Sequence, residues 1–580
     1  MTKIFFEETW TTVRDNVFSY DPYQVTSAIG SCLLVPVLVN YLFLVFRYHR
    51  GHKLEDHTKG QTPPEYPFFI PSIGPLGSIW LDHAGFLRRL STYAGRLTSN
   101  RVNILGTTYY NFQDRETIEK IFKAPTLSSS IEMYGWVNST LLGAPSKAMT
   151  VYYDDNSGPF PQPHPQSNVP SHNRIDYVTH HAIFRGLTGP GLQPMTLRYT
   201  RDLSKRMESL NLTREWTEMP DFANFFREMV GTGTLTAVIG PTILRLNPTF
   251  VQDMFKFDKM FPSFAPGFPS FLMPRSYSFR DRLTNCFKEW YKYAREHFEE
   301  SMVDEDGDGD PIWGSSMMRQ RQKTLSKVDH HDDETIARVD LGLAWATIGN
   351  VVLTSMFSSF HVFKDQELLD RVRQDIQEYL GDQSIHEADP ITLVKAIPLL
   401  SSVYAETLRL YIKVYSLYRS PHEDVPLGKW ILPKGALAVL NSGPSHMDAD
   451  FWNTKDGEHP VECFWSKRFL IDPSDARSGP VRPELRKPTN EKAVVDKKPY
   501  YSTEGCDGAW IPYGGGHSMC PGRFFARNVI IFTTALLATD YDIVIHSEKP
   551  KFTKKRYGMG VEDLKDPIPF RIRKRTAEKK

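Results

Sequence analysis

The sequence predicts a large, mainly α-helical domain with minor β-structure, preceded by a single N-terminal transmembrane helix. Residues 25–45 form an apolar stretch without any charged side chain, long enough to cross a membrane. Residues 338–363 are long and apolar, which is typical of a helix buried on all sides within a large domain. Short segments rich in β-branched and aromatic residues predict the strands. The composition, 40% hydrophobic and 24% charged, provides ample core material.

Charge and cysteine content exclude several classes of protein. Lys+Arg 69 and Asp+Glu 68 leave a net charge of +1, so no overall field points to a nucleic-acid partner. The five cysteines are scattered and odd in number, which argues against a disulfide framework and favours a reducing compartment.

The N-terminal apolar stretch is interpreted as a membrane anchor. At about 1.5 Å per residue it just spans the roughly 30 Å hydrocarbon layer. Arg47, Arg50 and Lys53 follow it directly, so the rest of the chain should lie on the cytosolic side. A cleaved signal peptide or a buried core helix is the alternative, but a signal peptide has its basic residues before a shorter apolar run. We therefore expect a short luminal N-terminus at 1–24, an anchor at 25–46, a basic and proline-rich hinge at 47–77, and the main domain at 78–580.

Elements of the main domain follow from local patterns. Residues 102–105 and 107–112 predict a hairpin of short strands, and Asp114 predicts the start of a helix. Further helices are expected at 366–380 and 396–410, and further strands at 430–432 and 437–440.

Three stretches predict loops or insertions: 157–172, 304–310 and 471–503. The acidic run 304–310 superficially resembles a calcium loop, with acids at the first, third and fifth positions and Gly309 at the sixth. Because the twelfth position is Ser315 and Pro311 interrupts the run, we expect a solvated loop rather than a calcium site.

Residues 511–523 read Ile-Pro-Tyr-Gly-Gly-Gly-His-Ser-Met-Cys-Pro-Gly-Arg and form the most informative stretch. Glycines allow positive φ angles, so backbone N–H groups can turn toward Cys520. A helix beginning near Pro521 would direct its N-terminal dipole at the same sulfur, and both effects stabilise a thiolate that binds a metal. Taken alone, the stretch is equally consistent with an inert buried cysteine in a glycine turn.

This stretch resembles the heme-binding loop of the cytochrome P450 superfamily, with Tyr513, Gly514, Gly516, Cys520 and Gly522 at the family positions. Three further segments match in the right order: Glu406 with Arg409, a degraded segment at 464–469 containing Arg468, and His181 with Arg185. The resemblance implies the cytochrome P450 fold, with 78–580 as the catalytic domain.

The resemblance also implies residue roles around a heme b cofactor. Cys520 would be the axial ligand of the iron, and Glu406, Arg409 and Arg468 would form a buried cluster that braces the proximal side. His181, Arg185 and Arg419 would contact the heme propionates, and His517 would belong to the same loop. Glu406 with Arg409 could instead be an ordinary helical ion pair, and His181 with Arg185 an ordinary surface pair.

The chain departs from the family pattern at two places. Ser518 replaces the usual arginine before the cysteine, with His517 beside it, and Gly349 and Asn350 replace the acid and the alcohol of the central helix. Both features are similar to the branch of sterol 7α- and 12α-hydroxylases and prostacyclin synthase, and the loop spelling to fungal relatives of that branch. Gly349 and Asn350 are expected to line the dioxygen pocket; a helix kink without a catalytic task is the alternative.

The resemblance implies a monooxygenase of the endoplasmic reticulum membrane, single-pass and with a cytosolic catalytic domain. It would oxidise a hydrophobic terpenoid, steroid or other secondary metabolite with O2 and electrons from NADPH, delivered by NADPH–cytochrome P450 reductase. Membrane lipid would be a further partner, and no nucleic acid is expected. A peroxide isomerase or dehydratase of the prostacyclin-synthase type, and a heme-binding membrane protein without turnover, are the alternatives.

Overall fold

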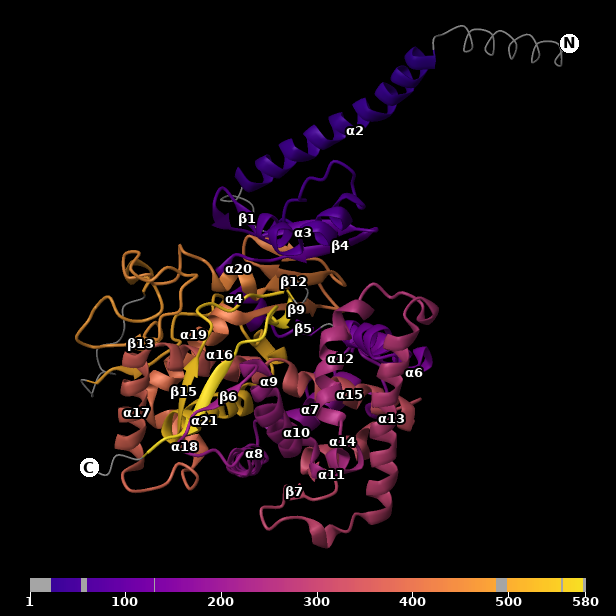
Figure 1. Ribbon diagram of the computed structural model, residues 1–580. Helices are drawn as coiled ribbons and strands as arrows, with labels where there is room; N and C mark the ends of the chain where they lie inside the picture. The colour runs from indigo at the N-terminus through magenta and orange to yellow at the C-terminus, as the bar shows by residue number, and fades with distance from the viewer. Residues whose placement is uncertain (1–21, 54–59, 130, 487–497, 554–556, 577–580) are drawn as a thin grey trace, which may run out of the picture.

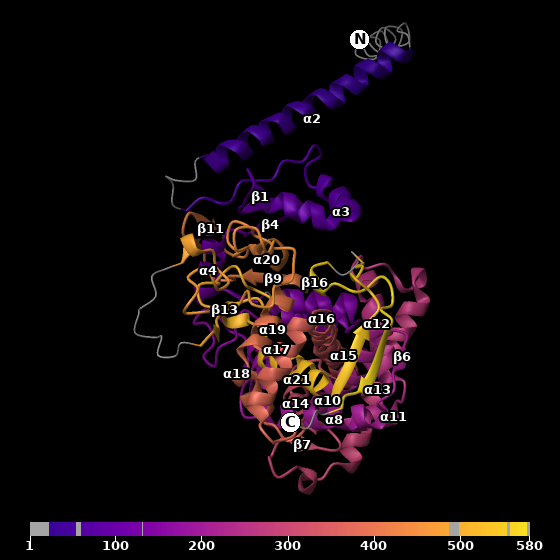
Figure 2. The same ribbon diagram turned by 60° about the vertical axis from the view of Figure 1, so that its left-hand side comes forward.

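Helix α2 (Pro22–Lys53) covers the predicted anchor and projects away from the rest of the molecule (Figures 1 and 2). The computed structural model describes residues 22–53, 60–129, 131–486, 498–553 and 557–576. Parts of the predicted luminal segment, of the hinge and of the 471–503 insertion lie outside these residues. The helix continues through Arg47 and Arg50 to Lys53, so the first residues of the predicted hinge are helical.

A mixed sheet lies between α3 (Gly74–Leu90) and the helical body (Figure 1). Its strand order is β16-β9-β12-β4-β3, with β5 paired to β9; β12 and β4 run parallel and the other pairs antiparallel. The predicted hairpin is confirmed, and its turn residues Leu105 and Gly106 both have positive φ, +50° and +85°. The strands are β3 (Asn100–Ile104), β4 (Thr107–Asn111), β5 (Ser128–Ser129), β9 (Ile412–Arg419), β12 (Leu437–Asn441) and β16 (Met559–Val561).

The described residues also form smaller sheets, and all of these are antiparallel. The predicted strands at 430–432 and 437–440 are confirmed as β11 and β12. The smaller sheets pair β1 (Thr92–Tyr93) with β2 (Arg96–Leu97), β7 (Gly309–Asp310) with β8 (Gly314–Ser315), β10 (Val425–Leu427) with β11 (Trp430–Leu432), β13 (Leu470–Ile471) with β14 (Tyr500–Tyr501), and β17 (Phe570–Lys574) with both β15 (Tyr541–Ile545) and β6 (Thr217–Met219).

The body is helical, which confirms the predicted class. Predicted helices at 366–380 and 396–410 appear as α17 and α19, and Asp114 caps α4 by accepting the N–H of Thr117 at 3.0 Å. The helices are α4 (Arg115–Lys123), α5 (Ile131–Trp136), α6 (Ser146–Asp154), α7 (Ile175–Leu187), α8 (Leu192–Ser209), α9 (Phe222–Phe226), α10 (Thr232–Ile239), α11 (Pro241–Leu246), α12 (Phe250–Phe264), α13 (Pro274–His297), α14 (Ser316–Leu325), α15 (Asp333–Gly349), α16 (Val351–Lys364), α17 (Gln366–Leu380), α18 (Pro390–Ala396), α19 (Pro398–Tyr411), α20 (Ser442–His446) and α21 (Arg523–Asp540).

Helices α15 and α16 form one long central helix that is interrupted at Asn350. Within the part of the chain that the structure fully describes, this helix, Asp333–Lys364, is long and apolar enough to cross a membrane; the sharply bent pair α18 and α19 adds a second candidate if it is counted as one span. Most of the apolar stretch of the central helix is buried in the protein, as predicted for a helix surrounded by a large domain.

The acidic run differs from the solvated loop predicted for it. Asp308 and Asp310 are buried, where Asp308 pairs with Arg198 at 2.5 Å and Asp310 pairs with Arg319. Asp310 also accepts the backbone N–H of Ile312 at 2.8 Å. Buried carboxylates need such partners, so the acids near the end of the run are structural, whereas those before them are exposed.

Candidate functional site

Cys520 ends a tight loop immediately before α21. Its backbone N–H donates to the carbonyl of Tyr513 at 3.0 Å, which closes the loop on itself. The helix begins at Arg523, two residues later than Pro521, because residues 521 and 522 form a turn. Hence the first free N–H groups of the helix, rather than a proline, meet the cysteine side chain.

The thiol of Cys520 faces backbone donors. Burial raises its pKa, and the N–H groups of Gly522 and Arg523, together with the Arg523 charge, act in the opposite direction. The side chain nevertheless keeps accessible surface. A cysteine that is surrounded by protein and still keeps accessible surface indicates a space beside the loop. Burial has the larger effect on the pKa, but the donors around the thiol would stabilise a thiolate bound to a metal.

Glycines shape the loop where the sequence predicts them. Gly514 and Gly516 have φ of +68° and +61°, a region that favours glycine. A Cβ on Gly515 would lie 2.3 Å from the ring of Phe122 in α4. The hydroxyl of Tyr418 in β9 accepts the N–H of Gly515 at 3.1 Å and donates to its carbonyl at 3.0 Å. The loop is therefore held closely between α4 and β9.

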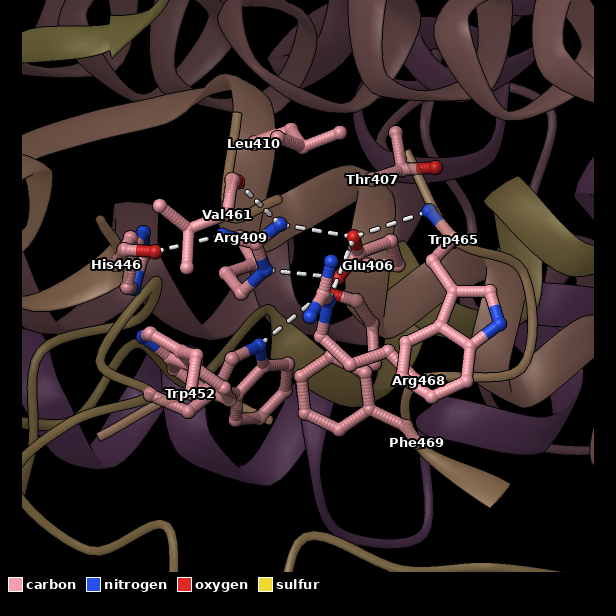
Figure 3. A network of polar contacts seen from close by, with 12 residues as sticks. Glu406, Thr407, Arg409, Leu410, His446, Trp452, Val461, Trp465, Arg468 and Phe469 are labelled. Atoms are coloured by element: carbon pink, nitrogen blue, oxygen red, sulfur yellow. Dashed lines mark hydrogen bonds and ion pairs between the residues drawn. The ribbon is translucent and has the colours of Figure 1, made fainter. Parts of the chain in front are cut away.

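Glu406, Arg409 and Arg468 form the predicted cluster, and all three side chains are fully buried (Figure 3). Glu406 accepts from Arg409 at 2.7 and 2.8 Å and from Arg468 at 3.0 Å. The N–H of Trp465 adds a fourth bond to the same carboxylate at 3.2 Å. This arrangement excludes the alternative of an exposed helical ion pair.

The two arginines also bind backbone carbonyls of the segments around them. Arg409 donates to the carbonyls of His446 and Val461, each at 2.7 Å, and Arg468 donates to that of Pro460 at 3.2 Å. Burial acts to raise the pKa of Glu406, but the charges of Arg409 and Arg468 outweigh it and hold the pKa below its ordinary value. The cluster therefore remains ionised and fixes α19 to residues 446–468.

His446 connects this cluster to the cysteine loop and was missed by the sequence analysis. Its carbonyl accepts from Arg409, while its Nε2 accepts the N–H of Ile511 at 3.1 Å and its Nδ1 lies 3.3 Å from the carbonyl of Ile412. Burial, with Lys413 and Arg409 nearby, holds the pKa of His446 well below its usual value, so the ring is neutral. A lone histidine has no spacing pattern that would have revealed this role.

Helix α7 carries His181 and Arg185 and lies beside the cysteine loop. A Cβ on Gly522 would be 3.7 Å from the side chain of Leu187 at the end of this helix. His181 and Arg185 are both exposed, and the His181 ring stacks on Tyr177 at 5.3 Å. His180 is a second residue that the sequence analysis missed. Burial lowers its pKa, and the charges of His181, Arg523 and His517 lower it further, so cationic groups gather here.

Arg419 and His517 both lie on segments at the glycine turn. Arg419 ends β9, the strand whose Tyr418 hydroxyl binds the backbone of Gly515. The exposed ring of His517 packs edge-on against Phe160 of the 157–172 insertion, with ring centroids 4.6 Å apart. The insertion therefore covers part of the cysteine loop.

Gly349 and Asn350 lie at the interruption of the central helix. Gly349 is buried, and Asn350 links α15 to α16 with φ −108° and ψ −42°. The Asn350 side-chain oxygen accepts the N–H of Val561 at 3.0 Å. Ala346, one turn earlier on the same face, is exposed although the helix runs through the interior. This face therefore borders an open space.

Two comparisons with known proteins agree with this geometry. The family model described as cytochrome P450 matches residues 186–565. The cytochrome P450 monooxygenase efuG of Hormonema carpetanum is 30% identical over 571 residues, covering 94% of this chain and 97% of that protein.

More distant similarities point the same way. The human 7-alpha-hydroxycholest-4-en-3-one 12-alpha-hydroxylase is 24% identical to this chain. The alignment covers 56% of this chain and 59% of the hydroxylase. The solved structure of a retinoic acid-bound cyanobacterial CYP120A1 superposes with a TM-score of 0.59 at 16% identity, covering 89% of this chain and all of the other, and it supports the fold alone. The resemblance seen in the sequence is confirmed: the chain belongs to the cytochrome P450 family of oxidoreductases.

Proposed function

We propose that the protein is a membrane-anchored heme-thiolate monooxygenase that hydroxylates or oxidises a hydrophobic small molecule. The observation that carries the proposal is Cys520, a residue that keeps accessible surface and whose thiol faces the N–H groups of Gly522 and Arg523. A heme iron with a thiolate ligand supplies the oxygen chemistry of such enzymes.

The residues present fit a heme. Cys520 keeps accessible surface at the end of its loop, and the exposed Ala346 of a buried helix supports an open space for the macrocycle and a substrate. His181, Arg185 and Arg419 lie on elements that flank the cysteine loop and are proposed to hold the propionates. Tyr513, Gly514, Gly516, His517 and Gly522 shape the loop itself.

The rest of the chain keeps this ligand in place. Glu406, Arg409 and Arg468 fix the proximal segments, and His446 transmits that rigidity to Ile511 at the start of the loop. The hydroxyls of Tyr404 in α19 and Tyr513 lie 2.8 Å apart and add a second connection. Gly349 and Asn350 are proposed to border the dioxygen site.

The substrate and the electron source are proposed from the relatives. The name of one relative is that of a hydroxylase of a steroid, which supports a steroid or a similar hydrophobic compound, such as a terpenoid or other secondary metabolite, as the substrate. Electrons would come from NADPH through NADPH–cytochrome P450 reductase.

Helix α2 is proposed to anchor the protein in the endoplasmic reticulum membrane, with the catalytic domain in the cytosol. Among the side chains of this helix that the structure describes, seven large apolar ones are 47–60% exposed, a surface that lipid would cover: Leu34, Val35, Leu38, Val39, Leu42, Phe43 and Phe46. Its last turns pack on the domain, where Tyr48 and His52 are buried against Tyr93 and Nε2 of His52 lies 2.9 Å from the Asn100 side chain. The anchor would thus hold the domain at a fixed orientation.

Spectroscopy of the reduced protein under carbon monoxide tests the heme assignment. We expect the red-shifted Soret band of thiolate ligation in the wild type and in Cys463→Ala, a control at another exposed cysteine. Cys520→Ala should lose the band because it removes the sulfur. A wild type without the band would refute the proposal.

A peroxide isomerase of the prostacyclin-synthase type is the second candidate. It is favoured by one observation: Gly349 and Asn350 carry neither the acid nor the alcohol of a proton relay. Turnover that requires NADPH and reductase supports the monooxygenase. Turnover of a hydroperoxide in the absence of both establishes the isomerase instead.

A further inference from the structure

Asn350 joins the start of α16 to β16, two segments that lie far apart in the sequence. Its backbone carbonyl accepts both the N–H and the hydroxyl of Thr354, at 3.0 and 2.7 Å, which starts α16 after the break. Its side-chain Oδ1 accepts the N–H of Val561 in β16 at 3.0 Å. A Cβ on the neighbouring Gly560, whose φ is +136°, would lie 2.0 Å from the same oxygen. The carboxamide of Asn350 therefore lies against the backbone of β16.

This contact fixes the direction of the carboxamide. A backbone N–H can only donate, so the atom of Asn350 that meets Val561 must be the oxygen. The nitrogen, with its two N–H donors, must then lie on the other branch of the amide. Free rotation of the group would break the bond to Val561, so donor and acceptor cannot exchange places.

The nitrogen of Asn350 borders an open space. Among the described residues the nitrogen has no hydrogen-bond partner. It is not one of the fully buried polar atoms without a partner, so it keeps some accessible surface. Asn350 is partly exposed in the middle of an internal helix, one turn from the exposed Ala346. Ala346 and Asn350 share a helix face at i and i+4, so the nitrogen and Ala346 face the same space.

We propose that Val561 and Gly560 orient Asn350 so that its N–H donors face the ligand side of the heme. This inference rests on the proposed function, because it takes the space beside Ala346 as the one above the heme. In this arrangement Asn350 is a hydrogen-bond donor to a polar ligand atom rather than an acid that relays protons. Gly560 and Val561 are positioning residues that act through Asn350, and β16 is the second half of the site.

Two measurements on the full-length holoprotein test separately the donor role of the Asn350 nitrogen and the acceptor role of its oxygen. The first is the infrared C–O stretch of the reduced carbon monoxide complex, which falls when a donor faces the ligand. The second is hydrogen exchange at the amide of Val561, which is slow while Asn350 accepts it. Asn350→Asp keeps an acceptor for Val561 but removes the donor, whereas Asn350→Leu removes both.

We expect Asn350→Asp to raise the C–O frequency while Val561 stays protected, and Asn350→Leu to raise the frequency and speed exchange at Val561. Gly560→Ala should shift the frequency although Asn350 is intact, because the added methyl displaces the carboxamide. Gly457→Ala, at a positive-φ glycine in open space, controls for backbone strain and should leave the frequency unchanged.

An unchanged C–O frequency in Asn350→Asp, or a Val561 amide still protected in Asn350→Leu, overturns the inference. Both outcomes leave the red-shifted Soret band intact and therefore do not touch the proposed function. A wild type that lacks this band refutes the proposed function itself, and the inference with it.

Discussion

At the scale of the residue, Gly515 shows how little space surrounds the cysteine loop. Its φ of −170° suits any residue, so a substitution there adds only a packing conflict, with a Cβ 2.3 Å from the ring of Phe122. We expect Gly515→Ala to destabilise the protein by about 1–3 kcal/mol and to weaken heme retention. Thermal unfolding and the heme-to-protein absorbance ratio measure both effects.

Gly77→Ala is the matched control for this prediction. Gly77 lies in α3 with open space around it, so the added methyl should be neutral or slightly stabilising. Wild-type stability in Gly515→Ala would contradict the close packing of the loop on α4.

Glu406 is the second residue whose replacement has a defined result. Glu406→Gln removes the charge that neutralises Arg409 and Arg468 while keeping the size of the side chain. We expect a loss of about 3–5 kcal/mol, because two buried guanidinium groups are left uncompensated. Denaturant unfolding measures this loss.

The exposed pair of Asp456 and Arg477 provides the comparison. Its side chains are 81% and 60% exposed, so Asp456→Asn should cost less than about 1 kcal/mol. A similar small cost in Glu406→Gln would mean that the cluster does not brace the fold.

Sequence spacing predicted the site residues whose partners lie only a few positions away in the sequence. Cys520 and the glycines share one loop, and Glu406 and Arg409 share one helical turn. His446 and Val561 were not predicted because they act through bonds to Ile511 and Asn350, which lie far away in the sequence. Only the folded chain brings these pairs together.

At the scale of the element, His386 connects α8, α21 and the loop after α17. Its Nε2 lies 2.9 Å from Asp540 and its Nδ1 lies 2.9 Å from the hydroxyl of Ser204. The hydrogen bond to Asp540 raises the pKa of His386 above its ordinary value, although burial opposes it. The charged form is therefore the one that stabilises the connection.

The stabilisation should depend on pH. A raised pKa in the folded state adds stability that is complete below the unfolded pKa of 6.5 and disappears as the pH rises through the folded value. Asp540→Asn should therefore destabilise the protein more at about pH 5.5 than at about pH 9, with a difference in unfolding free energy of at most about 1 kcal/mol, seen as a larger fall in Tm at the lower pH. Asp382→Asn, at an exposed carboxylate nearby, should show no such dependence. A pH-independent effect of Asp540→Asn would exclude the ion pair.

The acidic run 304–310 gives a second prediction for an element. Its buried carboxylates are occupied by Arg198, Arg319 and backbone N–H groups. Added calcium or a chelator should therefore leave the thermal unfolding curve unchanged. Asp308→Asn should lower the Tm because Arg198 loses its charged partner and keeps the Ala237 carbonyl. A calcium-dependent shift in the wild type would contradict this account.

Periodicity predicted the helices that have polar caps or alternating faces, such as α4 and α17. The apolar pattern runs on through Asn350 and so does not itself predict the interruption there. A helix kink at Gly349 and Asn350 is one interpretation of these two residues, and the structure shows the break, accompanied by a bond to Val561. Helix α21 also differs from its prediction, since it begins at Arg523 rather than near Pro521. Proline suits a first helical position, but here the turn before Arg523 supplies the donors for Cys520.

At the scale of the whole molecule, apolar side chains near α2 predict a second contact with lipid. Trp80 and Leu81 in α3 are 87% and 79% exposed, and α3 lies on the side of the body from which α2 projects (Figure 1). In nanodiscs with brominated lipid, part of the tryptophan emission should be quenched. Trp80→Phe should remove much of that quenched part.

Trp216→Phe is the control for this measurement. Trp216 precedes β6, which lies in the body away from α2 (Figures 1 and 2), and the guanidinium groups of Arg571 and Arg573 lie over its ring. Its replacement should leave the quenched part unchanged. Equal quenching in the wild type and in Trp80→Phe would place α3 outside the lipid.

The central helix has a consequence for biosynthesis. While the chain is being made, Asp333–Lys364 satisfies the criterion for a membrane span, and only packing removes that ambiguity. Its first half finds partners already synthesised, since Asp340 binds Tyr291 and Arg321 at 2.7 Å. Its second half packs on α21, which leaves the ribosome much later. The earlier helix α9 already covers part of α16, but the helix on which α16 packs most extensively is still missing at that stage, so its burial is completed only when α21 has been made.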